Sequence, residues 1–223
     1  MVLSLKVGYL MPGVVVKSMA GYDAHLILIS GTELLAFLPK KYAMRPYKVG
    51  ENLVAAIFLL ERNRIILSQR SPNFYQRVAE RVFSPILEQG KIRVKRAVSV
   101  IGAGFMKMAV EGLNGADPVH ACLPYLPEMK QYIDETVTLV RFAEDMKEYI
   151  RNALVPAPPD KIRKVIYSSS IREAIVTVDP HYYGLFVGKG GANVATAAKL
   201  LDIAIRIKRA EETEKEQGGE ADG

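Results

Sequence analysis

The 223-residue sequence predicts a multidomain protein in which an all-β barrel is followed by two copies of one α/β unit. Residues 1–70 contain short β-like runs separated by Gly, Pro and Asn, with almost no helical periodicity. From residue 71 onward, amphipathic helices alternate with strands. Asp-Pro helix starts recur about 62 residues apart, at Asp117 and Asp179, which indicates an internal repeat.

Five strands are expected in the first 70 residues. That number suits a small closed barrel, because closure removes the exposed strand edges. An oligonucleotide-binding (OB) barrel is therefore the natural candidate. The strands are expected at Val7–Ser18, His25–Ser30, Glu33–Leu38, Asn52–Leu60 and Arg64–Gln69.

The first α/β unit is expected over residues 71–142. Its opening helix follows Ser71-Pro72 and places apolar residues four apart on one face. The apolar residues are Phe74, Val78, Val82 and Ile86. The remaining elements are expected as strands Lys91–Val100 and Phe105–Glu111, a short helix from Asp117-Pro118, a second helix Glu128–Glu135 and a strand Thr136–Phe142.

The second α/β unit, residues 143–209, repeats the order helix, strand, strand, helix, helix, strand. Its elements are expected as helix Ala143–Leu154, strands Lys161–Ser168 and Arg172–Val178, a helix from Asp179-Pro180, helix Asn193–Leu201 and strand Ile203–Lys208. Residues 210–223 form an acidic tail without aromatic residues, which we expect to be disordered.

The net charge indicates the class of binding partner, and the cysteine content indicates the cellular compartment. The net charge is +6, but the last 13 residues hold six acids and one lysine, so residues 1–210 carry about +11. A basic body favours a polyanionic partner. The single cysteine, Cys122, excludes an internal disulfide framework and a Cys-rich zinc site. With no secretion signal and no long apolar run, we expect a cytoplasmic protein with no membrane partner.

The most specific segment is Leu185–Ala195, in which a short apolar helix, a Gly-Lys-Gly-Gly loop and a second helix follow one another. Glycines reach backbone angles closed to other residues and let the main chain approach a sugar-phosphate strand, while the next helix directs free N–H groups at phosphates. These features are those of the backbone clamp of a KH domain. The expected RNA-binding residues are Val187, Gly188, Lys189, Gly190, Gly191, Asn193 and Val194.

Other interpretations of the glycines are weaker. A nucleotide-binding Walker loop needs Gly-x-x-x-x-Gly-Lys-Ser/Thr, but Tyr183 stands five residues before Gly188 and Gly190 follows Lys189. A purely structural turn between two helices stays open, although Gly-Lys-Gly-Gly is more than a turn needs. The segment Gly102–Gly104 lies between two strands and is interpreted as a hairpin turn.

For catalysis the sequence offers no suitable group of residues. The three histidines, His25, His120 and His181, lie in three different modules, and none has a carboxylate or cysteine partner at ligand spacing. We therefore predict no enzyme activity, no metal site and no cofactor.

Residues from about 5 to 209 resemble the RNA-binding part of the bacterial NusA transcription elongation and termination factors. The resemblance is carried, in the family's order, by Ile65–Pro72, Asp117–Cys122, Val187–Val194 and Ala197–Leu200. It implies an OB-type S1 barrel followed by two α/β (type II) KH domains in series. It also implies that the chain binds single-stranded nascent RNA to modulate transcription elongation, termination or antitermination. RNA polymerase and other elongation factors are the further partners that it implies.

Two departures from the family pattern matter. Where the first KH unit of the family has its own Gly-x-x-Gly loop, this sequence has Pro124–Pro127. Proline fixes φ and offers no N–H to a phosphate, so we expect a packed spacer and a poor clamp, with Tyr125 as either a stacking residue or a plain surface tyrosine. Residues 1–70 are taken up by the expected barrel, so we expect no counterpart of the family's amino-terminal polymerase-binding domain in this sequence. The alternative function is a protein-interaction scaffold with the same fold and little RNA affinity.

The sequence predicts the RNA-binding face of the barrel less specifically than it predicts the glycine loop. Resemblance to S1 domains implies aromatic residues and a basic residue on the middle strands, and the nearest are Tyr22, His25, Phe37 and Arg70. Of these, we expect Phe37 in the core and His25 in solvent. Nearby lysines and arginines form either a basic rim or an ordinary solvated loop. They are Lys17, Lys40, Lys41, Arg45 and Lys48.

Overall fold

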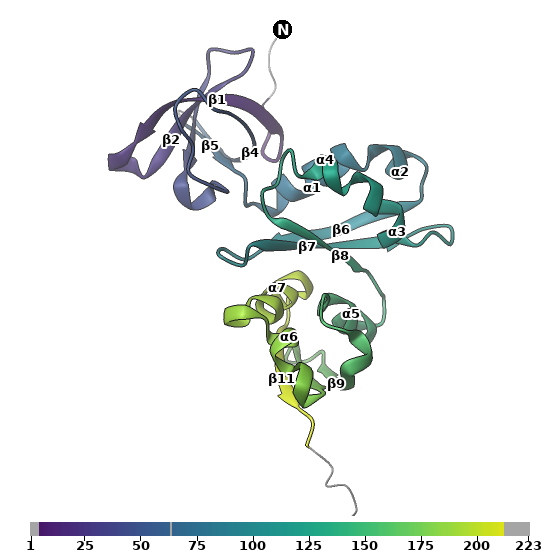
Figure 1. Ribbon diagram of the computed structural model, residues 1–223. Helices are drawn as coiled ribbons and strands as arrows, with labels where there is room; N and C mark the ends of the chain where they lie inside the picture. Colours follow the sequence, from purple (N-terminus) through teal and green to yellow (C-terminus); the bar gives the residue numbers. More distant parts are fainter. Residues whose placement is uncertain (1–4, 63, 212–223) are drawn as a thin grey trace, which may run out of the picture.

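The computed structural model describes residues 5–62 and 64–211, and in it three modules follow one another along the chain (Figure 1). A barrel comes first, one α/β unit lies in the middle, and a second α/β unit lies at the far end. The predicted multidomain fold, a barrel followed by two α/β units in series, is confirmed. Within the described residues, no helix is long and apolar enough to span a membrane.

The barrel is closed by five strands in the order β1-β2-β3-β5-β4. Neighbouring strands are antiparallel except β3 and β5, which pair in parallel. The strands are β1 (Leu10–Met19), β2 (Ala24–Ile29), β3 (Leu35–Pro39), β4 (Asn52–Glu61) and β5 (Arg64–Ser68). Fully buried aliphatic side chains such as Ile27, Leu38 and Leu67 fill the interior, so the barrel is a packed core.

The first α/β unit begins where Ser71 caps a helix. Its Oγ accepts from the backbone N–H of Phe74, and Pro72 occupies the first helical position. Strands β6 and β7 are antiparallel, while β7 and β8 are parallel. The elements are α1 (Pro72–Val82), α2 (Ser84–Glu88), β6 (Ile92–Ser99), β7 (Phe105–Gly112), α3 (Pro118–Cys122), α4 (Leu126–Met129) and β8 (Thr136–Arg141).

The helix predicted at Glu128–Glu135 is wrong in extent. The structure has a single turn, α4, and the chain then runs through turns to β8. The physical reason is a long-range contact: the buried carboxylate of Glu135 accepts hydrogen bonds from Arg70 at the barrel exit and from Tyr75 on α1. These bonds hold the segment after α4 against the barrel and α1. A helix that continued to Glu135 would carry this segment in a different direction.

The second α/β unit repeats the strand topology of the first, with β10 antiparallel to β9 and parallel to β11. Its elements are α5 (Met146–Ala153), β9 (Ile162–Ser168), β10 (Glu173–Val178), α6 (Tyr183–Val187), α7 (Ala192–Leu201) and β11 (Ala204–Arg209). In both units the Asp-Pro aspartate caps the following helical turn, since Asp117 accepts from the N–H of His120 and Asp179 from that of His181. The predicted disordered tail lies, from residue 212 on, outside the described residues.

The second unit packs on the outer face of the first unit's sheet. One hydrophobic cluster joins Val98, Ala109 and Val140 of the sheet to Ile150 on α5 and Ala197 on α7. Figure 1 shows α5 and α7 lying along this face, below β6, β7 and β8. The two units therefore share a core and are not joined by a linker alone.

Lys107 lies inside this shared interface, fully buried on β7, and donates to backbone carbonyls of the second unit. Burial lowers its pKa to about 7, whereas an unfolded lysine titrates at about 10.4. Between these two values the unfolded chain binds more protons than the folded one, so the free energy of unfolding should rise from pH 7 toward pH 9. Urea denaturation at both pH values checks this. If the free energy of unfolding of the Lys107→Met variant rises by the same amount between pH 7 and pH 9, other groups cause the effect.

Candidate nucleic-acid interface

The glycine loop lies between α6 and α7 and uses backbone angles that favour glycine. Gly188, Gly190 and Gly191 have φ of +77°, +59° and +78°. The turn is closed by a hydrogen bond of 3.0 Å from the N–H of Gly191 to the carbonyl of Gly188. Helix α7, ten residues long, begins directly after it. The positive end of the α7 dipole therefore lies next to the glycine loop.

The glycines differ in why they are needed. A Cβ on Gly188 would lie 2.7 Å from both the backbone nitrogen and the Cβ of Asn193, so the loop closes tightly onto α7 at this point. A Cβ on Gly190 or Gly191 would meet nothing within 4 Å. The side of the loop that carries these two residues is open, and a sugar-phosphate backbone can approach it closely.

The structure brings most of the predicted RNA-binding residues to the surface of this loop. Lys189 and Gly190 are exposed, whereas Val187, Gly188, Gly191 and Val194 are half-buried.

Asn193 is placed differently, since it is only 4% exposed. Its Nδ2 donates to the carbonyls of Leu154 (2.9 Å), Phe186 (3.1 Å) and Leu185 (3.3 Å). These bonds give Asn193 a supporting role, because an amide that bonds three carbonyls holds the loop in place, and its contact with RNA stays a prediction.

Two aromatic residues at the amino-terminal end of α6 are not among the predicted contacts. Tyr182 comes just before α6 and Tyr183 is its first residue. A cationic side chain lies over the ring of each tyrosine. Lys161 lies 5.4 Å from the first ring centroid and Arg209 lies 4.6 Å from the second. The available signal was the Tyr-Tyr pair, which four residues separate from Gly188. Lys161 also pairs with Asp160 at 3.0 Å, which offsets part of its charge.

The corresponding loop of the first unit has a different conformation. Tyr125 and Leu126 are in the right-handed helical region, so residues 123–125 lead directly into α4 without a left-handed turn. Tyr125 is half-buried and packs edge-on against Phe83, with ring centroids 6.2 Å apart. This geometry lacks the open glycine backbone of the second loop, in agreement with the expected packed spacer.

Two expectations for the barrel residues are wrong. His25 is only 2% exposed and faces the interior, edge-on to Tyr47 at 5.9 Å, while Phe37 lies half-buried on the outer face. The reason is strand alternation: β2 turns residues 25, 27 and 29 inward, and β3 turns residues 36 and 38 inward. Desolvation lowers the pKa of His25. Tyr22 is 76% exposed, as a contact residue would need to be.

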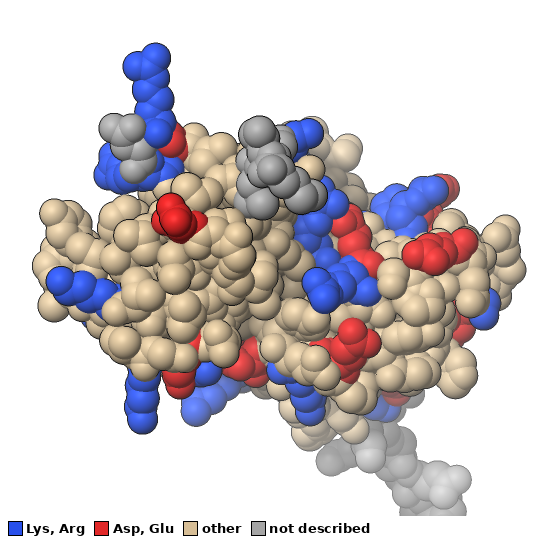
Figure 2. All heavy atoms as spheres, turned by 90° about the horizontal axis from the view of Figure 1, so that it is seen from above, with Lys and Arg blue, Asp and Glu red and all other residues tan. Residues whose placement is uncertain are grey.

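The exposed aromatic residues of the barrel, Tyr9, Tyr22 and Phe58, do not lie in one row on its outer face. One row of cross-strand neighbours runs over β2, β3, β5 and β4 and consists of Leu26, Phe37, Ile66 and Leu59. Phe37 is the one aromatic residue in this row. In Figure 2 the one face of the barrel that is seen, at the left, is mostly uncharged. Part of the expected basic rim is neutralised, because Lys40 pairs with Asp23 at 3.0 Å. Stacking needs aromatic faces, and this row supplies only that of Phe37.

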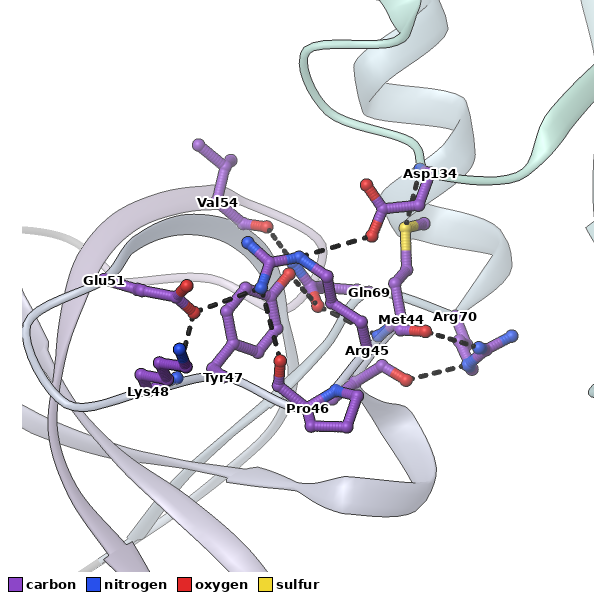
Figure 3. Close-up of polar contacts among 11 residues, drawn as sticks. Met44, Arg45, Pro46, Tyr47, Lys48, Glu51, Val54, Gln69, Arg70 and Asp134 are labelled. Atoms are coloured by element: carbon purple, nitrogen blue, oxygen red, sulfur yellow. Dashed lines mark hydrogen bonds and ion pairs between the residues drawn. The ribbon is translucent and has the colours of Figure 1, made fainter.

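Arg70, expected as a basic contact residue of the barrel, is instead part of the joint between the barrel and the first α/β unit (Figure 3). Its guanidinium donates to the carbonyls of Ala43 (2.9 Å) and Met44 (3.1 Å) and to Glu135 (2.9 Å). Arg45 lies next to this joint. It stacks 4.3 Å from the Tyr47 ring and pairs with Glu51 and Asp134.

Comparison with known proteins finds similarity to NusA proteins over most of the chain. Residues 146–215 match the family model of the NusA-like second KH domain. The transcription termination/antitermination protein NusA of Borreliella burgdorferi is 26% identical over 183 residues, which cover 77% of this chain and 37% of that protein. Its counterpart in Halalkalibacterium halodurans is 28% identical over 205 residues, covering 86% of this chain and 52% of that protein. That of Thermus thermophilus is 30% identical over 133 residues, covering 57% and 33%. The chain thus spans about a third to a half of the length of these relatives.

Proposed function

The chain is a NusA-like protein with an S1-type barrel and KH units, and from this premise we propose that it binds single-stranded RNA through the loop Gly188–Gly191. We further propose that it does so on nascent RNA, to modulate transcription elongation, termination or antitermination. The observation that carries the proposal is the open glycine loop: exposed Lys189 and Gly190 lie next to positive-φ backbone at the start of α7.

The proposed mechanism is non-catalytic. The backbone of about four nucleotides lies against Gly190 and Gly191, where the main chain has no side chains in the way. Lys189 supplies a point charge to a phosphate without reading a base. The first-turn amides of α7 add the positive end of the helix dipole. Val187 and Val194, both half-buried at the loop, receive the bases.

In this proposal the three modules have different tasks. The barrel (residues 1–70) and the first KH unit (residues 71–142) orient the second KH unit (residues 143–209) and contribute a salt-sensitive, sequence-independent attraction through their basic surface. RNA polymerase and other elongation factors are proposed as partners of the assembled complex.

The double change Lys189→Asp plus Gly190→Asp is expected to lower the affinity for A-rich single-stranded RNA at least about tenfold, because it puts two negative charges where a phosphate would lie. Fluorescence anisotropy across a salt series measures both the affinity and the number of phosphates that the protein neutralises. For every phosphate that the variant no longer neutralises, the slope of log K against log salt should become shallower by about 0.7.

A matched control changes the same charge elsewhere. Lys164→Asp lies on the outer face of the second unit's sheet, away from the loop, and alters the net charge by the same amount as Lys189→Asp alone. If the two single variants weaken binding equally, the loop is not the site. If the wild-type chain binds RNA no better than a neutral protein at low salt, RNA binding itself is refuted, and a scaffold function with this fold becomes the better explanation.

A further inference from the structure

Three consecutive carbonyls at the end of α5 serve two different modules. Those of Ala153 and Val155 each accept a hydrogen bond of 2.5 Å from Nζ of Lys107, which belongs to the first KH unit. That of Leu154, between them, accepts a bond of 2.9 Å from Nδ2 of Asn193 at the glycine loop. The last turn of α5 is thus held from one side by the first unit and holds the loop on the other.

The surroundings of Lys107 explain why it binds there. It is fully buried on the outer face of β7, in register with Val98 on β6 and Thr138 on β8. A buried ammonium group must find acceptors. The end of a helix presents carbonyls that have no partner within the helix, at the negative end of its dipole.

We propose that Lys107 is a positioning residue for the RNA clamp. Lys107 fixes the last turn of α5, and this turn fixes Asn193 and, through Asn193, the loop Gly188–Gly191. Lys107 itself belongs to the first KH unit and is fully buried in the interface between the two units. The RNA part of this proposal rests on the proposed function, but the positioning of the loop does not.

Two further contacts make the path short and stiff. Gly188 lies so close to Asn193 that an added Cβ would stand 2.7 Å from its backbone nitrogen, so a displacement of Asn193 must move the loop. On the other end of α7, Nζ of Lys199 donates to the carbonyl of Ser99 at 2.7 Å. The helix that follows the loop is therefore tied to the first unit at one end and, through Asn193 and the α5 turn, at the other.

The change Lys107→Met removes both bonds and keeps a side chain of similar length. We expect amide hydrogen exchange in residues 188–194 to become roughly tenfold faster in the absence of RNA. RNA affinity should fall severalfold while its salt slope stays unchanged, because Lys107 contacts no phosphate. An unchanged slope separates this effect from the Lys189 variant, which makes the slope shallower.

The control is Val140→Ala, which weakens the same interface without touching the α5 carbonyls. Unchanged exchange in Lys107→Met, or the same acceleration in Val140→Ala, would overturn the proposal. Should Lys107→Met not fold, Lys107→Gln, whose shorter side chain cannot span both carbonyls, is judged by the same criteria. Because exchange is measured without RNA, a failure of wild-type RNA binding refutes the proposed function and leaves the positioning of the loop to be decided by exchange.

Discussion

Replacing Glu135 with alanine should lower the free energy of unfolding by about 3–5 kcal/mol. The carboxylate is buried and accepts from Ser99 Oγ (2.6 Å), Tyr75 Oη (2.7 Å) and the Arg70 guanidinium (2.9 Å). Its removal leaves a guanidinium that is 17% exposed without its counter-ion and two buried hydroxyls without an acceptor. Such uncompensated groups cost far more than the pair contributes by forming.

The change Glu135→Ala should also loosen the barrel from the first α/β unit, since Arg70 belongs to the joint shown in Figure 3. Urea denaturation followed by far-UV circular dichroism measures the stability. The matched control is Glu111→Ala, which removes partly exposed pairs with Arg93 and Lys95 and should cost less than about 1 kcal/mol. Equal destabilisation of the two variants would show that burial of Glu135 contributes nothing.

Gly188→Ala should cost about 2–4 kcal/mol of stability and lower RNA affinity at least about tenfold. At φ +77° and ψ 166°, Gly188 occupies a backbone region essentially reserved for glycine. The added methyl group would also stand 2.7 Å from the backbone nitrogen of Asn193, which is held by three carbonyl contacts and cannot move freely.

Gly190→Ala separates the two causes. Gly190 has φ +59°, but a methyl group there meets nothing within 4 Å, so only backbone strain of about 1–2 kcal/mol applies. Anisotropy and urea denaturation are measured on both variants. If Gly190→Ala is as damaging to stability as Gly188→Ala, the close approach to Asn193 has no energetic role.

Several elements were predictable because their causes lie within a few residues. The caps at Ser71, Asp117 and Asp179 each bond an N–H two or three positions ahead. The glycine loop is equally local, since its positive φ angles demand glycine wherever the rest of the chain lies. The helical backbone at Pro124–Pro127, without a left-handed turn, likewise agrees with local proline chemistry.

The errors share a different cause. His25 and Phe37 were assigned to the wrong environments because a strand's composition does not say which face its odd residues take, and a shift of one residue exchanges the two faces. The helix expected up to Glu135 was shortened by bonds to Arg70 and Tyr75, more than 50 residues earlier in the chain. Motif matching placed Asn193 among the ligand contacts and did not predict that its burial makes it a support for the loop.

Local sequence was thus sufficient for the order of the modules, for most of their strands and helices, and for the position of the glycine loop. Tertiary packing alone decided which unit covers which sheet, and with it the burial of Lys107 and its bonds to the end of α5. The physical reason is that backbone preference acts over a few residues, whereas a buried charge finds its acceptors only after distant segments have met.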